Sequence, residues 1–260
     1  PNVARWRRTT TAGRTTTTEA DASSRDRLLG GKLVVQQPRG GYRIAVDTLL
    51  LAAATPAGAR VVDAGAGVGG AALALARTTA AGTVLALERD RRLARLLRAN
   101  IEANGLVGRV AAVVGDLARP PLAAGAADVV MTNPPYGAAA AGTLPATALG
   151  RAARHEAALD LAAWLGACAR LVRGGGEVVV VHRADRLPEL LAPLGSDVAV
   201  LPLWPRAGVP AKRVLVRARI GRRGPARLLS GLVLHDAEGH FTPEADAILR
   251  GEARLSWNRG

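Results

Sequence analysis

Four consecutive residues, Asn133, Pro134, Pro135 and Tyr136, carry groups suited to activating an amino nitrogen. They follow Asp128–Thr132, an apolar run that predicts a buried strand. The side-chain carbonyl of Asn133 and the main-chain carbonyl of Pro134 can accept both hydrogens of a planar NH₂ group. This bonding directs the nitrogen lone pair toward an electrophile, and the ring of Tyr136 offers a stacking surface. The run predicts group transfer to an exocyclic or amide nitrogen, with Asn133, Pro134 and Tyr136 as catalytic candidates.

A glycine-rich turn at Gly65–Gly70 is the second candidate site. It follows the short apolar run Arg60–Asp63 and precedes an alanine-rich segment, so a strand, a turn and a helix are expected in that order. Glycines in such a turn let a ligand approach the backbone without meeting Cβ atoms. The G-x-G-x-x-G spacing satisfies the dinucleotide fingerprint, and Glu88, at the end of the next expected strand, can accept both hydroxyls of a ribose. The turn therefore predicts a nucleotide-like cofactor, and a dinucleotide is one candidate.

An alternation of strands and helices must position these two sites. Strands are expected at Arg60–Asp63, Thr83–Glu88, Val110–Val114, Asp128–Thr132, Glu177–His182, Val198–Leu203 and Arg213–Ile220, with helices between most of them. Parallel neighbouring strands require crossover helices, so the pattern predicts an α/β, doubly wound, mostly parallel seven-stranded sheet. The last two strands lack a helix between them, which predicts an antiparallel final hairpin. Both candidate sites then lie at the carboxyl ends of the parallel strands.

The two ends of the chain differ from this central pattern. Residues 1–26 are rich in threonine and arginine and poor in large apolar residues, so a disordered basic tail is expected. The main domain is expected over residues 27–222, with Asp47 as the N-cap of a helix at Thr48–Ala54. Residues 223–260 are expected to form a C-terminal hairpin and helix packed on that domain, with Thr242 as the helix N-cap.

The segment from Asp63 to Gly67 resembles motif I of class I S-adenosylmethionine-dependent methyltransferases, because an aspartate precedes the first glycine. This resemblance implies the Rossmann-like methyltransferase fold and favours S-adenosylmethionine over a dinucleotide. That cofactor also has no pyrophosphate to place at the helix N-terminus. The resemblance further implies that Asp116 contacts the cofactor adenine. The cofactor-binding candidates are Asp63, Gly65, Gly67, Glu88, Asp116 and Asn133.

Several stretches resemble, more narrowly, the bacterial tRNA1(Val) (adenine-N6)-methyltransferase family. Besides Asn133–Tyr136, they are Gln37–Arg43, Asp47–Ala52 and Gly231–His235, and the resemblance runs from about Leu29 to Arg250. It implies methylation of the exocyclic N6 amine of an adenosine near the anticodon of tRNA. Because the methyl group comes from a sulfonium, direct in-line transfer is expected, and catalysis rests on positioning and carbonyl dipoles. A base within folded RNA must be extruded to reach Tyr136.

Other functions remain open at this point. A protein glutamine N-methyltransferase of the release-factor type uses the same Asn-Pro-Pro-Tyr turn on an amide nitrogen, but usually has a helical substrate domain before the cofactor motif. A DNA adenine methyltransferase usually has a target-reading domain. The third alternative, a non-catalytic nucleic-acid-binding protein on this scaffold, is disfavoured by the presence of Asn133, Pro134 and Tyr136.

The charge of the chain is concentrated in two segments. Its 35 Lys and Arg residues against 21 Asp and Glu residues give a formal net charge of +14. Residues 1–14 hold four arginines and residues 206–227 hold eight basic residues, with no acid in either, so the rest carries only +2. Basic and apolar side chains alternate in the expected strand at Arg213–Ile220, which predicts a basic outer face suited to binding phosphates. Such charges can instead protect an edge strand from pairing with another chain. The nucleic-acid-binding candidates are Arg206, Lys212, Arg213, Arg217 and Arg219.

Composition excludes several other classes of protein. Cys168 has no partner for a disulfide, and the apolar stretches are shorter than the ~20 residues of a membrane-spanning helix. The sequence does not open on a secretory signal, so a cytoplasmic enzyme without membrane contact is expected. His235, Asp236, Glu238 and His240 could ligate a metal, but a polar hairpin turn is favoured and no metal is expected. We expect a monomer that acts on tRNA.

Overall fold

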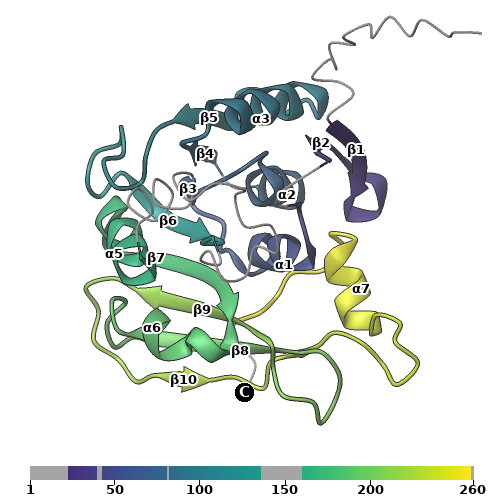
Figure 1. Cartoon of the computed structure of the whole chain (residues 1–260). Helices are drawn as coiled ribbons and strands as arrows, with labels where there is room; N and C mark the ends of the chain where they lie inside the picture. Colours follow the sequence, from purple (N-terminus) through teal and green to yellow (C-terminus); the bar gives the residue numbers. More distant parts are fainter. Residues whose placement is uncertain (1–22, 40–42, 81, 136–159, 259–260) are drawn as a thin grey trace, which may run out of the picture.

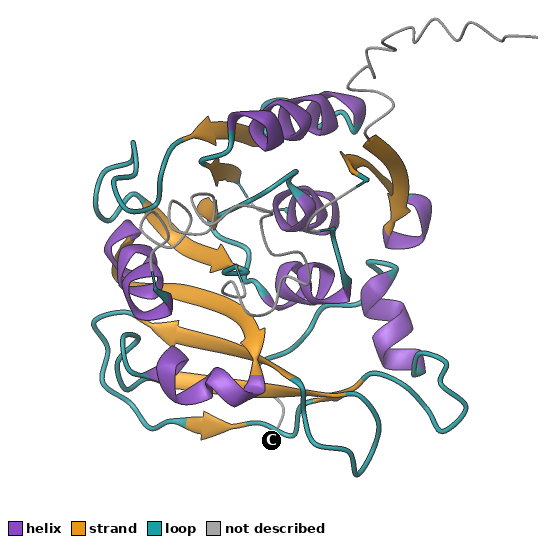
Figure 2. Ribbon diagram, viewed as in Figure 1, coloured by secondary structure: helices purple, strands orange, loops and turns teal. Residues whose placement is uncertain are grey.

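A computed structural model describes residues 23–39, 43–80, 82–135 and 160–258, and Figure 1 shows how their elements are arranged. A nine-stranded sheet runs in the order β10-β8-β9-β7-β6-β3-β4-β5, and β11 pairs with β8. Helices cover both faces of this sheet (Figure 2), which confirms the doubly wound α/β fold.

The strands are β3 (Arg60–Ala64), β4 (Thr83–Glu88), β5 (Val110–Val114), β6 (Ala127–Thr132), β7 (Val172–Arg183), β8 (Val198–Trp204), β9 (Arg213–Arg219), β10 (Arg227–Leu228) and β11 (Leu232–Val233). The helices are α1 (Val46–Ala54), α2 (Gly70–Thr78), α3 (Arg91–Ala103), α5 (Leu161–Leu171), α6 (Leu187–Leu191) and α7 (Pro243–Leu249).

The strand directions agree with the sequence, whereas the strand number does not. Strands β3 to β7 are all parallel to one another, and β9 is antiparallel to both β7 and β8, which confirms the antiparallel final hairpin. The sheet has nine strands instead of seven because β10 and β11, each two residues long, pair in parallel with β8. Such short strands have too few residues for periodicity to predict them.

The sheet separates two apolar layers. One layer lies under α1, α2 and α3 and contains Leu51, Leu73 and Met131, all fully buried. The other lies under α5 and α6 and contains Leu165 and Cys168, also fully buried. Within the described residues, no helix is long and apolar enough to cross a membrane.

The first described element is an antiparallel hairpin of β1 (Ser23–Leu28) and β2 (Leu33–Pro38). The predicted tail over residues 1–26 is therefore wrong for residues 23–26, while residues 1–22 lie outside the described part of the chain. Partly buried and exposed residues alternate along β1. Because its exposed residues include Arg25 and Arg27, the segment has no apolar run from which a strand could be predicted. The apolar surface comes from β2, where Leu33 and Val35 are fully buried.

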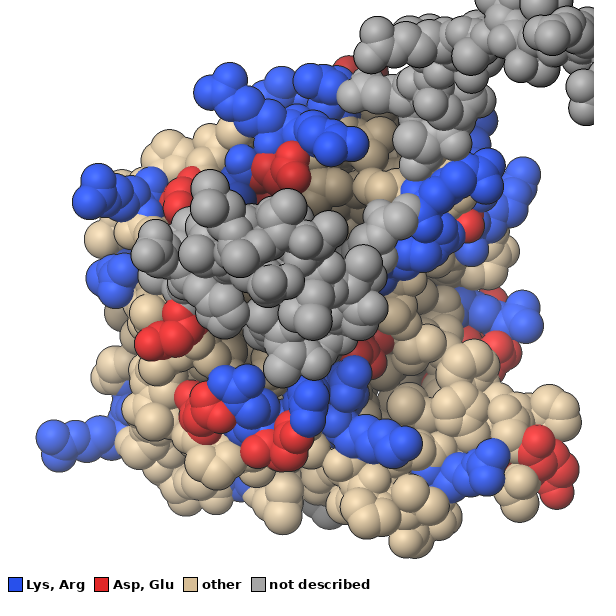
Figure 3. Space-filling view, viewed as in Figure 1, with Lys and Arg blue, Asp and Glu red and all other residues tan. Residues whose placement is uncertain are grey.

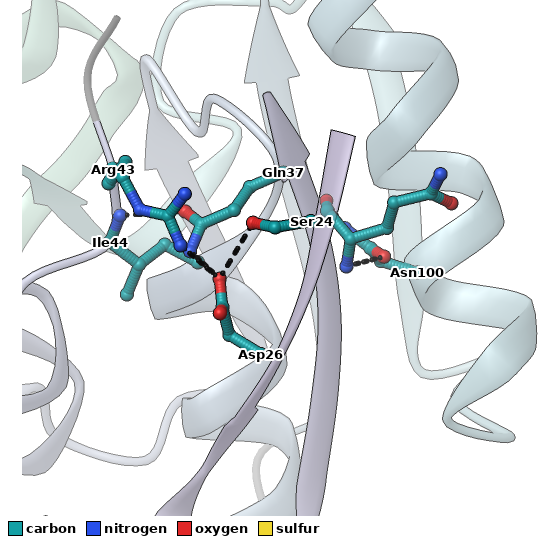
Figure 4. A network of polar contacts seen from close by, with 7 residues as sticks. Ser24, Asp26, Gln37, Arg43, Ile44 and Asn100 are labelled. Atoms are coloured by element: carbon teal, nitrogen blue, oxygen red, sulfur yellow. Dashed lines mark hydrogen bonds and ion pairs between the residues drawn. The ribbon is translucent and has the colours of Figure 1, made fainter. Parts of the chain in front are cut away.

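A polar cluster joins this hairpin to the segment that enters α1. Oδ2 of Asp26 accepts hydrogen bonds from Nε2 of Gln37 and from Nη2 of Arg43, the latter at 2.6 Å. The amide oxygen of Gln37 in turn accepts from the main-chain N–H of Ile44 at 2.9 Å, and Figure 4 shows the cluster. Gln37 is only 2% exposed, so its amide bonds also offset the cost of burying it.

Helix α1 begins earlier than the sequence predicts. Its N-cap is Ala45, which makes no side-chain capping bond, so the expected capping role of Asp47 is wrong. Because the helix starts at Val46, Asp47 lies in the first turn, where a carboxylate interacts favourably with the helix dipole. Its Oδ2 accepts from Nε of Arg213 at 2.9 Å, which ties α1 to the start of β9.

The other end of α1 is closed by residues near the C-terminus. Carbonyl groups in the last turn of a helix have no partner within the helix. Here the carbonyl oxygen of Ala52 accepts from Nη1 of Arg254 at 3.0 Å, and that of Ala54 accepts from Nε1 of Trp257 at 2.6 Å. The N–H of Leu255 donates to Ala53, so successive carbonyls are satisfied by one distant segment.

Asn100 of α3 and Asn104, the C-cap of that helix, bind the free edge of β2. The side chain of Asn104 accepts from the N–H of Val34 at 2.9 Å and donates to its carbonyl, and Asn100 bonds in the same way to Gln36. The rise along a helix over four residues is close to the rise along a strand over two residues, so both asparagines can reach alternate residues of β2. Their side chains make the hydrogen bonds that a neighbouring strand would make. Nδ2 of Asn100 also donates to the carbonyl of Val68 at 3.0 Å, so one amide joins α3, the hairpin and the glycine turn.

We expect Asn100→Asp to lower the free energy of unfolding by about 3 kcal/mol or more, because a buried carboxylate would face two carbonyl oxygens in place of an NH₂ group. Protonation restores one donor, so the deficit should shrink as the pH is lowered. Urea denaturation at pH 7 and pH 5 measures both effects. The matched control is Asn258→Asp at an exposed asparagine, expected within about 0.5 kcal/mol of the parent. Equal losses in the two variants would contradict the role of Asn100.

Candidate active site

The two motifs that are separate in the sequence meet at the carboxyl edge of the sheet. In the β3–β4 pairing Ala64 lies opposite Leu87, and in the β3–β6 pairing Ala64 lies opposite Thr132. The residues that follow, Gly65, Glu88 and Asn133, are therefore side by side. The hydroxyl of Thr132 also donates to the carbonyl of Ala64 at 2.8 Å, which closes the junction between β3 and β6.

The glycine turn is held from below by strand β4. The N–H groups of Gly65 and Ala66 both donate to the carbonyl of Leu87, at 2.9 and 3.0 Å. Gly65 has φ +77°, and a Cβ atom there would lie 2.8 Å from Cζ2 of Trp164, so glycine is required for two independent reasons. Gly67 has φ +57°, and no described atom lies within 4 Å of where its Cβ would be. The turn therefore presents open main chain at Gly67, as a ligand cradle needs.

Glu88 is fixed in place by main-chain donors. Its Oε2 accepts from the N–H of Gly67 at 2.8 Å, and its Oε1 accepts from the N–H of Asp90 at 2.8 Å. A carboxylate oxygen has two lone pairs, so each oxygen can still accept a hydroxyl. Glu88 is 7% exposed and ends β4 at the site, as the sequence predicts.

Asp63 lies underneath the turn, beside the first turn of α2. It is 3% exposed, and its Oδ2 accepts from the N–H of Ala72 at 3.1 Å. Burial raises the pKa of Asp63 to about 7; the Ala72 N–H opposes this rise, and the nearby Glu88 carboxylate adds to it. The predicted cofactor residue thus supports the turn and the start of α2.

Asn133 continues β6 directly into the site, and its neighbour Pro134 is buried. Tyr136 lies outside the described residues, so its stacking role stays a prediction. Trp164 of α5 supports this strand end, because its Nε1 donates to the Thr132 hydroxyl at 2.9 Å. The sequence interpretation missed this role of Trp164. A buried tryptophan usually finds a partner for its N–H, but that partner, 32 positions away, cannot be identified from periodicity.

Asp116 lies two residues after β5, at the same edge of the sheet. Val114 pairs with Glu88, so Asp116 is beyond the end of the strand next to Glu88. It is exposed, and its Oδ1 accepts from the N–H of Ala118 at 2.9 Å. Strand order thus brings all three predicted carboxylates, Asp63, Glu88 and Asp116, to adjacent strand ends.

Strand β9 is an inner strand between β7 and β8, and its predicted basic face is partly covered within the fold. The nucleic-acid role of its arginines stays a prediction. Nε of Arg219 donates to Oε1 of Glu177 at 3.2 Å, and Arg213 pairs with Asp47. Arg217 lies within 3.9 Å of Glu177 and 5.0 Å from the ring centre of Trp257, and its side chain is 13% exposed. Acids and an aromatic ring within the fold therefore engage all three arginines. Arg206 and Lys212, which precede β9, are exposed.

Cys168, His182 and His235 are each buried or packed against a neighbouring ring. Cys168 is fully buried, and burial raises its thiol pKa to about 12, which leaves it protonated. His182 is 1% exposed, and burial, assisted by Arg186 and Arg213, lowers its pKa to about 4. His235 stacks on Phe241 with ring centres 4.7 Å apart, and Thr242 caps α7 as expected. Among the described residues, no group of three His, Cys, Asp or Glu side chains is placed to hold a metal ion.

Comparisons with known proteins agree with this geometry. The family model of the methyltransferase small domain matches residues 42–194. A curated protein of Aeromonas hydrophila, named tRNA1(Val) (adenine(37)-N6)-methyltransferase, is 34% identical over 218 residues, which cover 80% of this chain and 89% of that protein. A protein of the same name from Aeromonas salmonicida is 32% identical over 221 residues with the same coverage. The crystal structure of a predicted O-methyltransferase from Agrobacterium tumefaciens superposes with a TM-score of 0.68 at 24% identity, covering 82% of this chain and 99% of that one, and shows the same fold.

The raised pKa of Asp63 predicts how stability changes with pH. The folded protein keeps a proton on Asp63 up to about pH 7, whereas an unfolded aspartate ionises near its ordinary pKa of 3.8. The folded state therefore binds the extra proton between these values, and this contribution to stability falls as the pH rises toward 7. Relative to Asp63→Asn, the free energy of unfolding should fall by about 1.4 kcal/mol per pH unit between pH 5 and 6.5, and change little above pH 8. Urea denaturation across this range measures the difference, and parallel curves for the two proteins would contradict it.

Proposed function

The chain belongs to the methyltransferase small domain family, and from that premise we propose that it transfers a methyl group from S-adenosylmethionine to the exocyclic N6 amine of an adenosine in tRNA. The observation that carries the proposal is the strand register that makes the glycine turn and Asn133 neighbours at one sheet edge. A methyl donor and an acceptor amine must meet at such a junction. The names of both Aeromonas relatives specify adenine 37 of tRNA1(Val), which favours an adenosine near the anticodon.

The donor set fits the cofactor. Glu88 can receive two ribose hydroxyls, because each of its oxygens keeps a lone pair beyond its main-chain bond. Gly67 leaves open space above the turn, and we assign Asp116, on the adjacent strand end, to the adenine amine. Bound S-adenosylmethionine supplies a methyl group on a positively charged sulfur.

The acceptor side depends on carbonyl oxygens that are fixed before the reaction. We assign the Asn133 side-chain carbonyl and the Pro134 main-chain carbonyl to the two hydrogens of the target amine. These bonds hold the nitrogen so that its lone pair points toward the glycine turn. As positive charge develops on that nitrogen, the two oxygen dipoles stabilise it. Trp164 and Thr132 keep the strand end from shifting, so little reorganisation is needed.

Labelled S-adenosylmethionine distinguishes this reaction from the other candidates. The protein is incubated separately with total tRNA, duplex DNA and release factor, and the labelled products are digested and identified. We expect label in N6-methyladenosine from tRNA. Label only in a glutamine of the protein substrate, only in DNA, or in none of the three would overturn the proposal.

We expect Asn133→Ala to lower turnover by about a hundredfold or more while cofactor affinity changes only a few-fold, because the residue contacts the amine. Single-turnover methylation of tRNA and a cofactor-binding titration give the two quantities. The matched control is Asn258→Ala at an exposed asparagine, which should retain both. An equal loss of turnover and cofactor binding in Asn133→Ala would contradict the assigned role.

A further inference from the structure

The exposed face of α3 has more positive charge than the helix itself can balance. Arg91, Arg92, Arg95 and Arg98 all lie on this face, and Asp90 precedes them as the N-cap. Arginines three or four positions apart repel each other, and cations in the first turn oppose the helix dipole. Within the described residues, Arg91, Arg92 and Arg98 form no ion pair. This face would therefore be stabilised by a polyanion.

A groove of about 290 Å³ runs between this helix and β1. Ser24 and Arg25 line one wall, and Ala99 and Ala103 line the other. Arg92 lies on the same stripe of the helix as these alanines, because seven and eleven residues are close to whole turns. The small side chains of Ala99 and Ala103 leave room beside Arg25, and Arg92 lies about two turns before Ala99 on the helix. We call the groove, together with Arg92, the basic groove.

Arg92 lies in the first turn of α3, the end of the helix nearest the candidate active site, whereas Ala99 and Ala103 lie in its last turns. Helix α3 starts three residues after Glu88. Strand β2 runs alongside this helix, because the side chains of Asn100 and Asn104 bond to the backbone of β2. Figure 3 shows Lys and Arg side chains over α3 and over the neighbouring hairpin on this face of the molecule. A long polyanion held in the groove can therefore also extend to the strand ends.

We propose that the basic groove between β1 and α3 binds the phosphate backbone of the RNA substrate away from the methylated base. This inference rests on the proposed function. Arg25, Arg27 and Arg92 are exposed and form no ion pair within the described chain, in contrast to Arg213 and Arg219 of β9, which are paired with acids. The chain's own residues 1–22 hold four arginines and two acids, so their charge does not complement the groove. RNA supplies the regular negative charge that this surface matches.

The test compares two double variants that remove the same charge from different parts of the molecule. Arg25→Ala/Arg92→Ala changes the basic groove. Arg222→Ala/Arg223→Ala is the control, because both arginines are exposed and follow the end of β9. That end lies beside Gly175, near the start of β7, and away from the candidate active site. Fluorescence anisotropy with labelled tRNA, without cofactor and at several salt concentrations, gives affinity and salt slope. Methylation kinetics then separate the KM for tRNA from kcat.

For Arg25→Ala/Arg92→Ala we expect a Kd and a KM for tRNA about tenfold higher, an unchanged kcat, and a salt slope smaller by about 1.5. The control should stay within about twofold of the parent. Equal weakening in both double variants would show dependence on net charge alone and overturn the inference, as would an unchanged Kd for Arg25→Ala/Arg92→Ala. A parent protein that binds tRNA through these arginines but transfers no methyl group would refute the proposed function and leave the groove intact.

Discussion

The buried amide of Asn100 is the interaction on which the arrangement of the active-site half of the molecule depends. It is 2% exposed and bonds to both main-chain groups of Gln36 and to the carbonyl of Val68. A single side chain thus fixes the hairpin, helix α3 and the glycine turn relative to one another. A buried amide is costly unless its hydrogen bonds are made, so displacement of any one of these parts leaves unpaired groups in the others. The Asn100 amide therefore supports the glycine turn from α3, in addition to the Leu87 carbonyl and the Glu88 carboxylate.

Local patterns in the sequence predicted most of the fold and the sheet edge at which the candidate site residues lie, whereas long-range pairing determined the rest. Thr83–Glu88 and Val110–Val114 match the structure at both ends, because apolar runs bounded by turn residues predict buried strands. Strand β1 was missed because its apolar partner surface lies on β2. The arginines of β9 were expected to face solvent because alternation identifies a shared face but not what covers it. Glu177 and Trp257 cover Arg217 on that face, and neither is near it in sequence.

The charge distribution separates structural arginines from those available to a partner. Arginines of the inner strand are paired with acids within the fold, and Arg217 is largely enclosed between an acid and an indole ring. Arginines on α3 instead repel one another on an open surface. The same residue type therefore contributes to stability in one place and reduces it in another. A net charge of +14 describes neither situation, and only the pairing of individual side chains distinguishes them.

The segment that closes α1 has a consequence for the order in which the protein folds. Arg254 lies 202 positions after Ala52, whose carbonyl it satisfies, and Trp257 lies 203 positions after Ala54. During synthesis, α1 emerges from the ribosome long before Arg254 and Trp257 are made. Until then the carbonyl groups of its final turn must bind water, or the turn must fray. The helix that borders the glycine turn is therefore completed late, and nascent chains that lack residues 254–257 should depend on chaperones to keep this apolar layer from aggregating.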